Sequence, residues 1–213
     1  MINQVLFLFG LYGFGVYFGL LFKRELPCSL IASTGYLWGA LFWVIGGVGL
    51  LSASIPFSLT SMLVYFVLLG TGISFFHSRN KTWKLSHRDR FWLLSIAFLY
   101  LITLVATSYF NLSTTSPDSI VLIATGKRLP YVGFSDAVIK ELSLRGVFLS
   151  VLQSAAEFLG DGYLYAAQPG FGLSFLLVFF FLSQRITDHL APQKHWNFAL
   201  SFMTSLALFS TYF

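Results

Sequence analysis

Residues 111–145 read NLSTTSPDSIVLIATGKRLPYVGFSDAVIKELSLR, and this stretch decides how the rest of the chain is organised. It is the only long segment polar enough to lie in water, and apolar runs that cannot lie in water precede and follow it. Simple connections between helices are only about 2–8 residues long, so a polar connection of this size is usually functional. We therefore expect any chemistry of this protein to take place in this loop.

The composition is that of an integral membrane protein. Of the 213 residues, 56% are hydrophobic and only 10% are charged, whereas about 25% of the residues of a soluble domain are charged. The mean hydropathy is +0.77, and apolar runs recur along the whole length. We therefore expect one transmembrane domain over residues 1–213. The net charge of +5 is expected in cytoplasmic loops, so nucleic acid is not expected as a partner.

Seven apolar segments resemble membrane helices, because about 20 helical residues cross a hydrocarbon core of about 30 Å. They are residues 2–22, 28–51, 57–76, 91–110, 147–160, 169–183 and 196–213. The fifth segment is short, and a second interpretation is that residues 147–168 form a helix that does not fully cross. The expected fold is all-α: a polytopic transmembrane helix bundle of about seven membrane segments with a structured external loop.

Residues 77–90 give the strongest signal for orientation, because bases far outnumber acids there. The charged side chains are Arg79, Lys81, Lys84, Arg88, Asp89 and Arg90. Short loops rich in Lys and Arg stay in the cytoplasm, so the amino terminus and the loop 111–145 are expected on the non-cytoplasmic side of a plasma or inner membrane. An anionic-lipid or partner site at 77–90 is compatible with this placement. Strict alternation of seven spans would place residues 185–194 outside, against the same rule.

Two pairs of glycines have small-xxx-small spacing: Gly15 with Gly19, and Gly35 with Gly39. This spacing allows two helix backbones to approach closely. The pairs are expected to be packing faces, used either against a neighbouring helix of the same chain or against a partner helix. Membrane lipids are the other expected partners.

The sequence predicts no cofactor. The lone Cys28 cannot form an intramolecular disulfide, and no Cys/His cluster has metal-ligand spacing. The four histidines lie in or beside basic polar connections. No phosphate-cradling glycine loop, zinc-protease helix or nucleophile elbow occurs. A divalent metal is therefore without support in the sequence.

Two short interfacial helices are expected within the loop 111–145. The first opens at Pro117 and Asp118, where the helix macrodipole favours a carboxylate near the amino end. Residues 126–133 are expected to form a turn region, because they begin and end with glycine. Residues 134–144 have the spacing of a second, amphipathic helix.

Asp118 is the first candidate catalytic residue. A carboxylate at the outer membrane surface can take a proton from an acceptor hydroxyl. Lys127, Arg128 and Arg145 can hold the phosphate of a lipid-linked donor through charge-assisted hydrogen bonds. This pairing suits transfer from a polyprenyl-phosphate carrier whose tail remains in the bilayer. The alternative is that Asp118 only caps a surface helix after Pro117.

Glu157 and Asp161 are further candidates, because acids within membrane segments are costly and commonly functional. They stand four residues apart and share one face if a helix continues between them. The alternative is that Glu157 lies close enough to the end of its segment to reach water. The first four expected spans carry no acids, which weakens the interpretation as a proton or ion transporter.

Several motifs from Phe91 onward follow a known order. They are Ser116-Pro117-Asp118-Ser119 after a span, Leu144-Arg145-Gly146 at the entry to the next segment, Glu157-Phe158-Leu159-Gly160 at a hairpin turn, and the closing apolar run 199–213. This order resembles the GT-C superfamily of polytopic glycosyltransferases, in particular the protein-mannosyltransferase and aminoarabinose-transferase branch. In that family a span leads into a large external loop, which opens with an acidic pair and contains two short helices along the membrane.

The resemblance implies transfer of a sugar from a polyprenyl-phosphate donor to an acceptor on the non-cytoplasmic face. It implies Asp118 as the general base, and Lys127, Arg128 and Arg145 as ligands of the donor phosphate. It divides the chain into three accessory spans (1–90) and a GT-C-like part (91–213). The family has a second acid where this chain has Ser119, so the resemblance implies no second carboxylate role here. Family members have more spans and often a soluble carboxy-terminal domain, so the chain is expected to be the amino-terminal portion of such an enzyme. The alternative is a non-catalytic polytopic protein, either an assembly factor or a transporter component.

Overall fold

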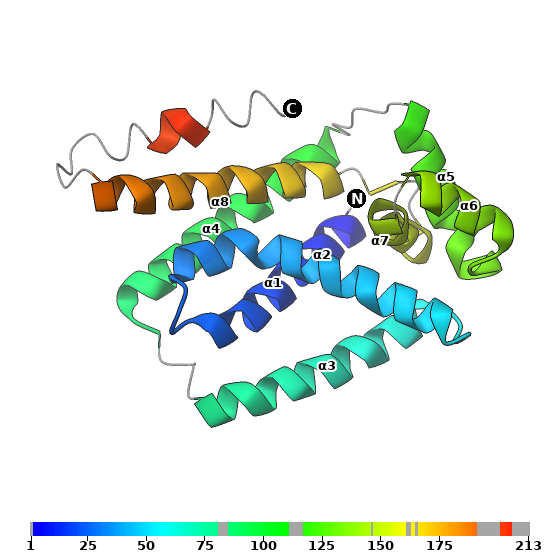
Figure 1. Cartoon of the computed structure of the whole chain (residues 1–213), viewed down its shortest axis with the longest axis horizontal. Helices are drawn as coiled ribbons and strands as arrows, with labels where there is room; N and C mark the ends of the chain where they lie inside the picture. Colours follow the sequence, from blue (N-terminus) through cyan, green and yellow to red (C-terminus); the bar gives the residue numbers. More distant parts are fainter. Residues whose placement is uncertain are drawn as a thin grey trace.

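The computed structural model describes residues 2–80, 85–110, 117–145, 147–160, 163–164, 166–190 and 201–205, and every regular element within them is helical. The helices are α1 (Ile2–Gly19) with the 3₁₀ turn η1 (Leu20–Phe22), α2 (Cys28–Ser52), α3 (Leu59–Asn80), α4 (His87–Tyr109), α5 (Pro117–Val132), α6 (Asp136–Arg145), α7 (Val147–Phe158) and α8 (Ala167–Leu190) (Figure 1). The expected all-α class is confirmed for this part of the chain.

Five helices are long and apolar enough to cross a membrane, so the chain is a multi-pass, membrane-embedded helical protein. The candidate spans are Ile2–Phe22, Cys28–Ser52, Leu59–Arg79, His87–Tyr109 and Ala167–His189. The expected segment 196–213 lies outside the described residues except for 201–205, which are helical. The expected number of seven membrane segments is therefore not confirmed.

Helix α7 occupies the expected fifth segment, residues 147–160, but it is too short to be a span. It has 12 residues, which correspond to a length of about 18 Å, well below the hydrocarbon thickness of about 30 Å. It is nevertheless deeply enclosed, since every residue from Ser150 to Ala156 is buried. The second of the two interpretations of this region, a helix that does not fully cross, therefore fits the structure better than a fifth span.

Helices α1 and α2 pack backbone against backbone. A Cβ atom on Gly15 would overlap the carbonyl oxygen of Gly35, and one on Gly39 would overlap the carbonyl oxygen of Leu11. All the glycines of both small-xxx-small pairs are buried. The faces that were candidates for a partner helix are therefore covered within the chain.

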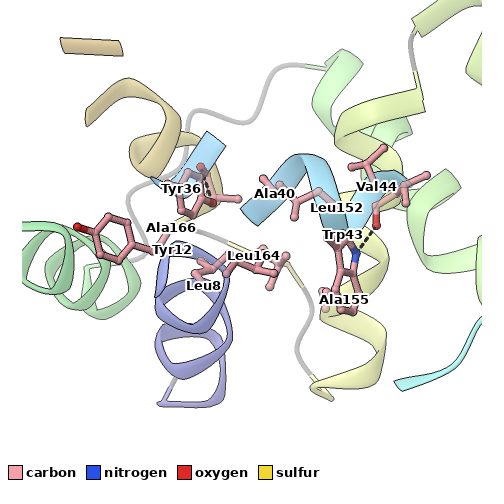
Figure 2. Close-up of a cluster of buried hydrophobic side chains, with 14 of the residues drawn as sticks. Leu8, Tyr12, Tyr36, Ala40, Trp43, Val44, Leu152, Ala155, Leu164 and Ala166 are labelled. Carbon is pink, nitrogen blue, oxygen red and sulfur yellow. Dashed lines mark hydrogen bonds between the residues drawn. The ribbon is translucent and has the colours of Figure 1, made fainter. Parts of the chain in front are cut away.

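The core is centred on α2, which contacts α1, α4, α7 and α8. Figure 2 shows side chains of α2 beside Leu8 of α1 and Leu152 of α7. Buried polar groups must find partners inside the protein when no water is near. Accordingly, the Tyr36 hydroxyl donates to the carbonyl of Ala167 at 3.1 Å, and Trp43 Nε1 donates to the carbonyl of Val151 at 3.0 Å. These two bonds tie α2 to the start of α8 and to α7.

Helix α8 runs antiparallel to α4. Trp92 in the first turns of α4 packs edge-on against Phe181 in the second half of α8, with ring centroids 5.2 Å apart. Farther along α4, the Tyr100 hydroxyl shares a hydrogen bond with Ser174, which lies in the first half of α8. The end of α8 therefore returns to the end of the bundle where α4 begins (Figure 1).

This return favours the second interpretation of residues 147–168 over strict alternation, which would place residues 185–194 on the opposite side from residues 77–90; of these, 81–84 and 191–194 lie outside the described residues. Arg185 lines the same cavity as Lys23, Arg24 and Arg88. The length of α7 agrees with this interpretation, because a helix too short to cross would add no change of side. We call this end of the bundle, formed by residues 23–25, the end of α3, the start of α4 and the end of α8, the basic end. The opposite end, with α5, α6 and α7, is the loop end.

Candidate functional site

The loop end is built from α5 and α6, which lie beside α7 (Figure 1). Helix α5 begins at Pro117, as the sequence predicts, but it continues to Val132, so the predicted turn over 126–133 is wrong. The turn comes at Gly133, whose φ of +57° lies in the left-handed region that favours glycine. Gly126 serves a different purpose, because a Cβ there would overlap the carbonyl oxygen of Ser150 on α7.

The continuous α5 sets the spacing of the predicted site residues. Asp118 is the second residue of α5, and Lys127 and Arg128 follow it by nine and ten residues, a rise of roughly 13–15 Å along the helix. Arg128 is exposed and Lys127 is partly exposed. Arg145 is the last residue of α6. Because α5 has no turn between Asp118 and Lys127, the two cations are not brought close to the acid. A donor in contact with Asp118, Lys127 and Arg128 would have to extend along the helix.

Glu157 lies at the protein surface. Its Oε1 accepts a hydrogen bond of 2.7 Å from the hydroxyl of Tyr131 on α5, and Tyr131 is 74% exposed. This bond and the charge of the carboxylate raise the pKa of Tyr131, because both favour the protonated phenol. Helix α7 ends at Phe158 and Gly160 has a φ of +68°. The helix that would put Glu157 and Asp161 on one face therefore stops before Asp161, which lies outside the described residues.

The buried polar face of α7 was not anticipated from the sequence. Ser150, Gln153 and Ser154 are fully buried. Gln153 Oε1 accepts the backbone N–H of Leu164 at 3.1 Å, while Gln153 Nε2 and Ser150 Oγ have no partner among the described residues. The signal was present, since these residues and Glu157 follow the i, i+3, i+4, i+7 spacing of one helical face. The face lies against α5, where the Gln153 Cβ would be 3.2 Å from a Cβ on Gly126.

The described residues do not bring together three His, Cys, Asp or Glu side chains in a way that could hold a metal ion. Comparison of the chain with protein-family models, with curated proteins and with solved structures finds no match. The likeness to GT-C glycosyltransferases thus rests on the order of features in the sequence.

Proposed function

We propose that this protein transfers a sugar from a polyprenyl-phosphate donor to an acceptor at the loop end of the bundle. One observation carries the proposal: the apolar helix α4 is followed by a helix that opens at Asp118 and then by a second short helix. Both lie at the end of the bundle opposite the cations that begin α4 (Figure 1). An acid at a membrane surface, with cations farther along the same helix, suits a donor whose tail stays in the bilayer and whose head carries phosphate.

The distribution of charge supports a non-cytoplasmic loop end. Among the described residues, the basic end carries Lys23, Arg24, Arg79, Arg88, Arg90 and Arg185 against Glu25, Asp89 and Asp188. The loop end carries Lys127, Arg128, Lys140 and Arg145 against Asp118, Asp136, Glu141 and Glu157. The excess of Lys and Arg marks the cytoplasmic side of a membrane protein. The proposed orientation therefore places the basic end in the cytoplasm and the amino terminus with the loop end outside.

In the proposed reaction, the Asp118 carboxylate takes the proton of an acceptor hydroxyl. At the same time the oxygen of that hydroxyl bonds to the anomeric carbon of the sugar. The bond from that carbon to the phosphate oxygen breaks, and its electron pair leaves with the polyprenyl phosphate. Lys127, Arg128 and Arg145 stabilise the charge that develops on the phosphate. The acceptor oxygen and the leaving phosphate oxygen flank the same anomeric carbon, so on this proposal the flexible side chains of Lys127 and Arg128 span most of the spacing along α5 between the phosphate and Asp118.

The competing class is a non-catalytic assembly factor or transporter component. In that interpretation, the helix faces with Gly15 and Gly19 and with Gly35 and Gly39 would bind a partner helix. Those faces are occupied by the α1–α2 contact. The feature on which the transferase proposal depends, an acid at the start of a loop-end helix, is present as Asp118 of α5.

Binding of the carrier lipid tests the proposal without knowledge of the sugar, because all donors of this class share the carrier. We expect the full chain in phosphatidylcholine nanodiscs to bind undecaprenyl or dolichyl phosphate, as measured by native mass spectrometry. Lys127→Gln combined with Arg128→Gln should weaken binding about tenfold, because two charge-assisted contacts to phosphate are lost.

The matched control is Arg79→Gln combined with Arg90→Gln, which removes the same charge from exposed positions at the basic end. It should leave carrier binding within about twofold, given the distance between the two ends and salt screening beyond about 8–10 Å. Absence of carrier binding by the unmodified chain, or equal weakening by both double variants, would refute the proposed donor site.

A further inference from the structure

A cavity of about 420 Å³ opens at the basic end, between the connection before α2, the start of α4 and the end of α8. Its charged lining consists of Lys23, Arg24, Arg88, Arg185, Glu25 and Asp188. Cations therefore outnumber acids in the lining. The volume falls within the range of about 300–1,000 Å³ usual for small-molecule sites. It is large enough for a phosphate group with a small organic substituent.

The cavity also has an apolar wall. Leu30, Trp92, Phe181 and Leu182 contribute to it, and the Trp92 and Phe181 rings pack edge to face at 5.2 Å. These residues belong to candidate spans, close to the ends that carry the charged groups. Tryptophan is enriched where a span meets the membrane surface, because its ring is amphipathic. A cavity that is cationic at one side and apolar at the other matches an amphiphile with an anionic head.

Two arginines are the main candidates for contact with an anion. Lys23 Nζ already pairs with Asp89 Oδ2 at 3.0 Å, so part of its charge is compensated. Arg88 on α4 and Arg185 on α8 are exposed and line the cavity from different helices. A guanidinium group can bind a phosphate through two parallel hydrogen bonds. The antiparallel packing of α4 and α8 thus brings two phosphate-binding groups from distant parts of the sequence to one cavity.

We propose that this cavity binds the phosphate head group of an anionic phospholipid from the leaflet at the basic end. Arg88 and Arg185 hold the phosphate, and Trp92 and Phe181 pack against the glycerol and the first methylenes of the acyl chains. Basic pockets between helices at this depth suit such lipids. Free inorganic phosphate shares the head-group chemistry but leaves the apolar wall unused. The proposal is independent of sugar transfer, which is assigned to the other end of the bundle.

The test compares lipids of different charge on the full chain in detergent micelles by native mass spectrometry. We expect phosphatidylglycerol to bind at least about tenfold more tightly than phosphatidylcholine with the same acyl chains, since both arginines attract a lipid that carries a net negative charge. Arg88→Gln combined with Arg185→Gln should reduce this preference to about twofold or less. Arg88→Lys combined with Arg185→Lys, which keeps the charge and the fold, should retain an intermediate preference.

The matched control is again Arg79→Gln combined with Arg90→Gln, because these exposed cations of the same end do not line the cavity. It should preserve the full preference for phosphatidylglycerol. The proposal is overturned if the unmodified chain binds both lipids equally, a result that needs no variant, or if the control loses as much preference as the cavity variant. Stabilisation by inorganic phosphate equal to that by phosphatidylglycerol at the same concentration would overturn the assignment to a lipid.

Discussion

Gly39→Ala should separate α1 from α2 and lower the thermal unfolding midpoint of the purified protein by roughly 10 °C. A Cβ at position 39 would overlap the carbonyl oxygen of Leu11 and lie 3.0 Å from its Cα. Both are backbone atoms, so the clash cannot be relieved by rotating a side chain. Overpacking a core costs about 1–3 kcal/mol, and more when the backbone must move. A clash with backbone puts the cost at the upper end of this range, about 3 kcal/mol, and at about 2–4 °C per kcal/mol for a chain of this size this lowers the midpoint by roughly 10 °C.

The control for this prediction is Gly49→Ala on the same helix. A Cβ at position 49 has nothing within 4 Å, and the residue is exposed. Replacing glycine by alanine in a helix interior stabilises by about 0.5–1 kcal/mol when there is space, so the midpoint should stay the same or rise slightly. If Gly39→Ala unfolds at the same temperature as Gly49→Ala, the α1–α2 contact described above is wrong.

Asp118→Asn should reduce sugar transfer by a factor of about 100 or more while membrane insertion stays normal. General-base catalysis contributes about 10²–10⁴ to the rate of a reaction, and an amide cannot accept the proton that a carboxylate takes. The change is nearly isosteric. Transfer is measured with membranes that contain the variant, a set of polyprenyl-phosphate donors carrying radiolabelled sugars, and extraction of labelled products.

Asp136→Asn is the matched control, because Asp136 is an exposed acid in the first turn of another loop-end helix, α6. It removes the same charge from the same end of the molecule and should keep at least about half of the activity, because exposed surface substitutions usually leave stability nearly unchanged and Asp136 has no part in the proposed reaction. Full activity of Asp118→Asn would remove this carboxylate from the mechanism. Equal losses in both variants would point to the net charge of the loop end rather than to a general base.

The long apolar segments could be predicted from the sequence because hydrophobic length alone identifies a candidate span. The expected segments 2–22, 28–51, 57–76 and 91–110 match α1 to α4 to within a few residues. The start of α5 at Pro117 could also be predicted, because proline favours the first turn of a helix. These features depend on local composition, which a sequence displays directly.

The path of the chain after α6 could not be predicted in the same way. Hydropathy counts apolar residues but does not reveal whether a short helix crosses or turns back, so the side reached by Arg185 stayed open until α4 and α8 were seen to pack antiparallel. The role of Gly126 was ambiguous for a related reason. A glycine allows either a turn or a close approach of two helices. Only the position of Ser150 on α7 shows that Gly126 allows a close approach of α5 and α7.

The basic end exists only if α7 does not cross the membrane, because only then does the end of α8 face the same side as the start of α4. Single-cysteine labelling tests it directly. In a Cys28→Ser background, which removes the chain's lone cysteine, His87→Cys, His189→Cys and Ser135→Cys are all at exposed positions. A membrane-impermeant thiol reagent should label His87→Cys and His189→Cys from one side and Ser135→Cys from the other. Labelling of His189→Cys from the same side as Ser135→Cys would contradict this, because the end of α8 would then not lie on the same side of the membrane as the start of α4.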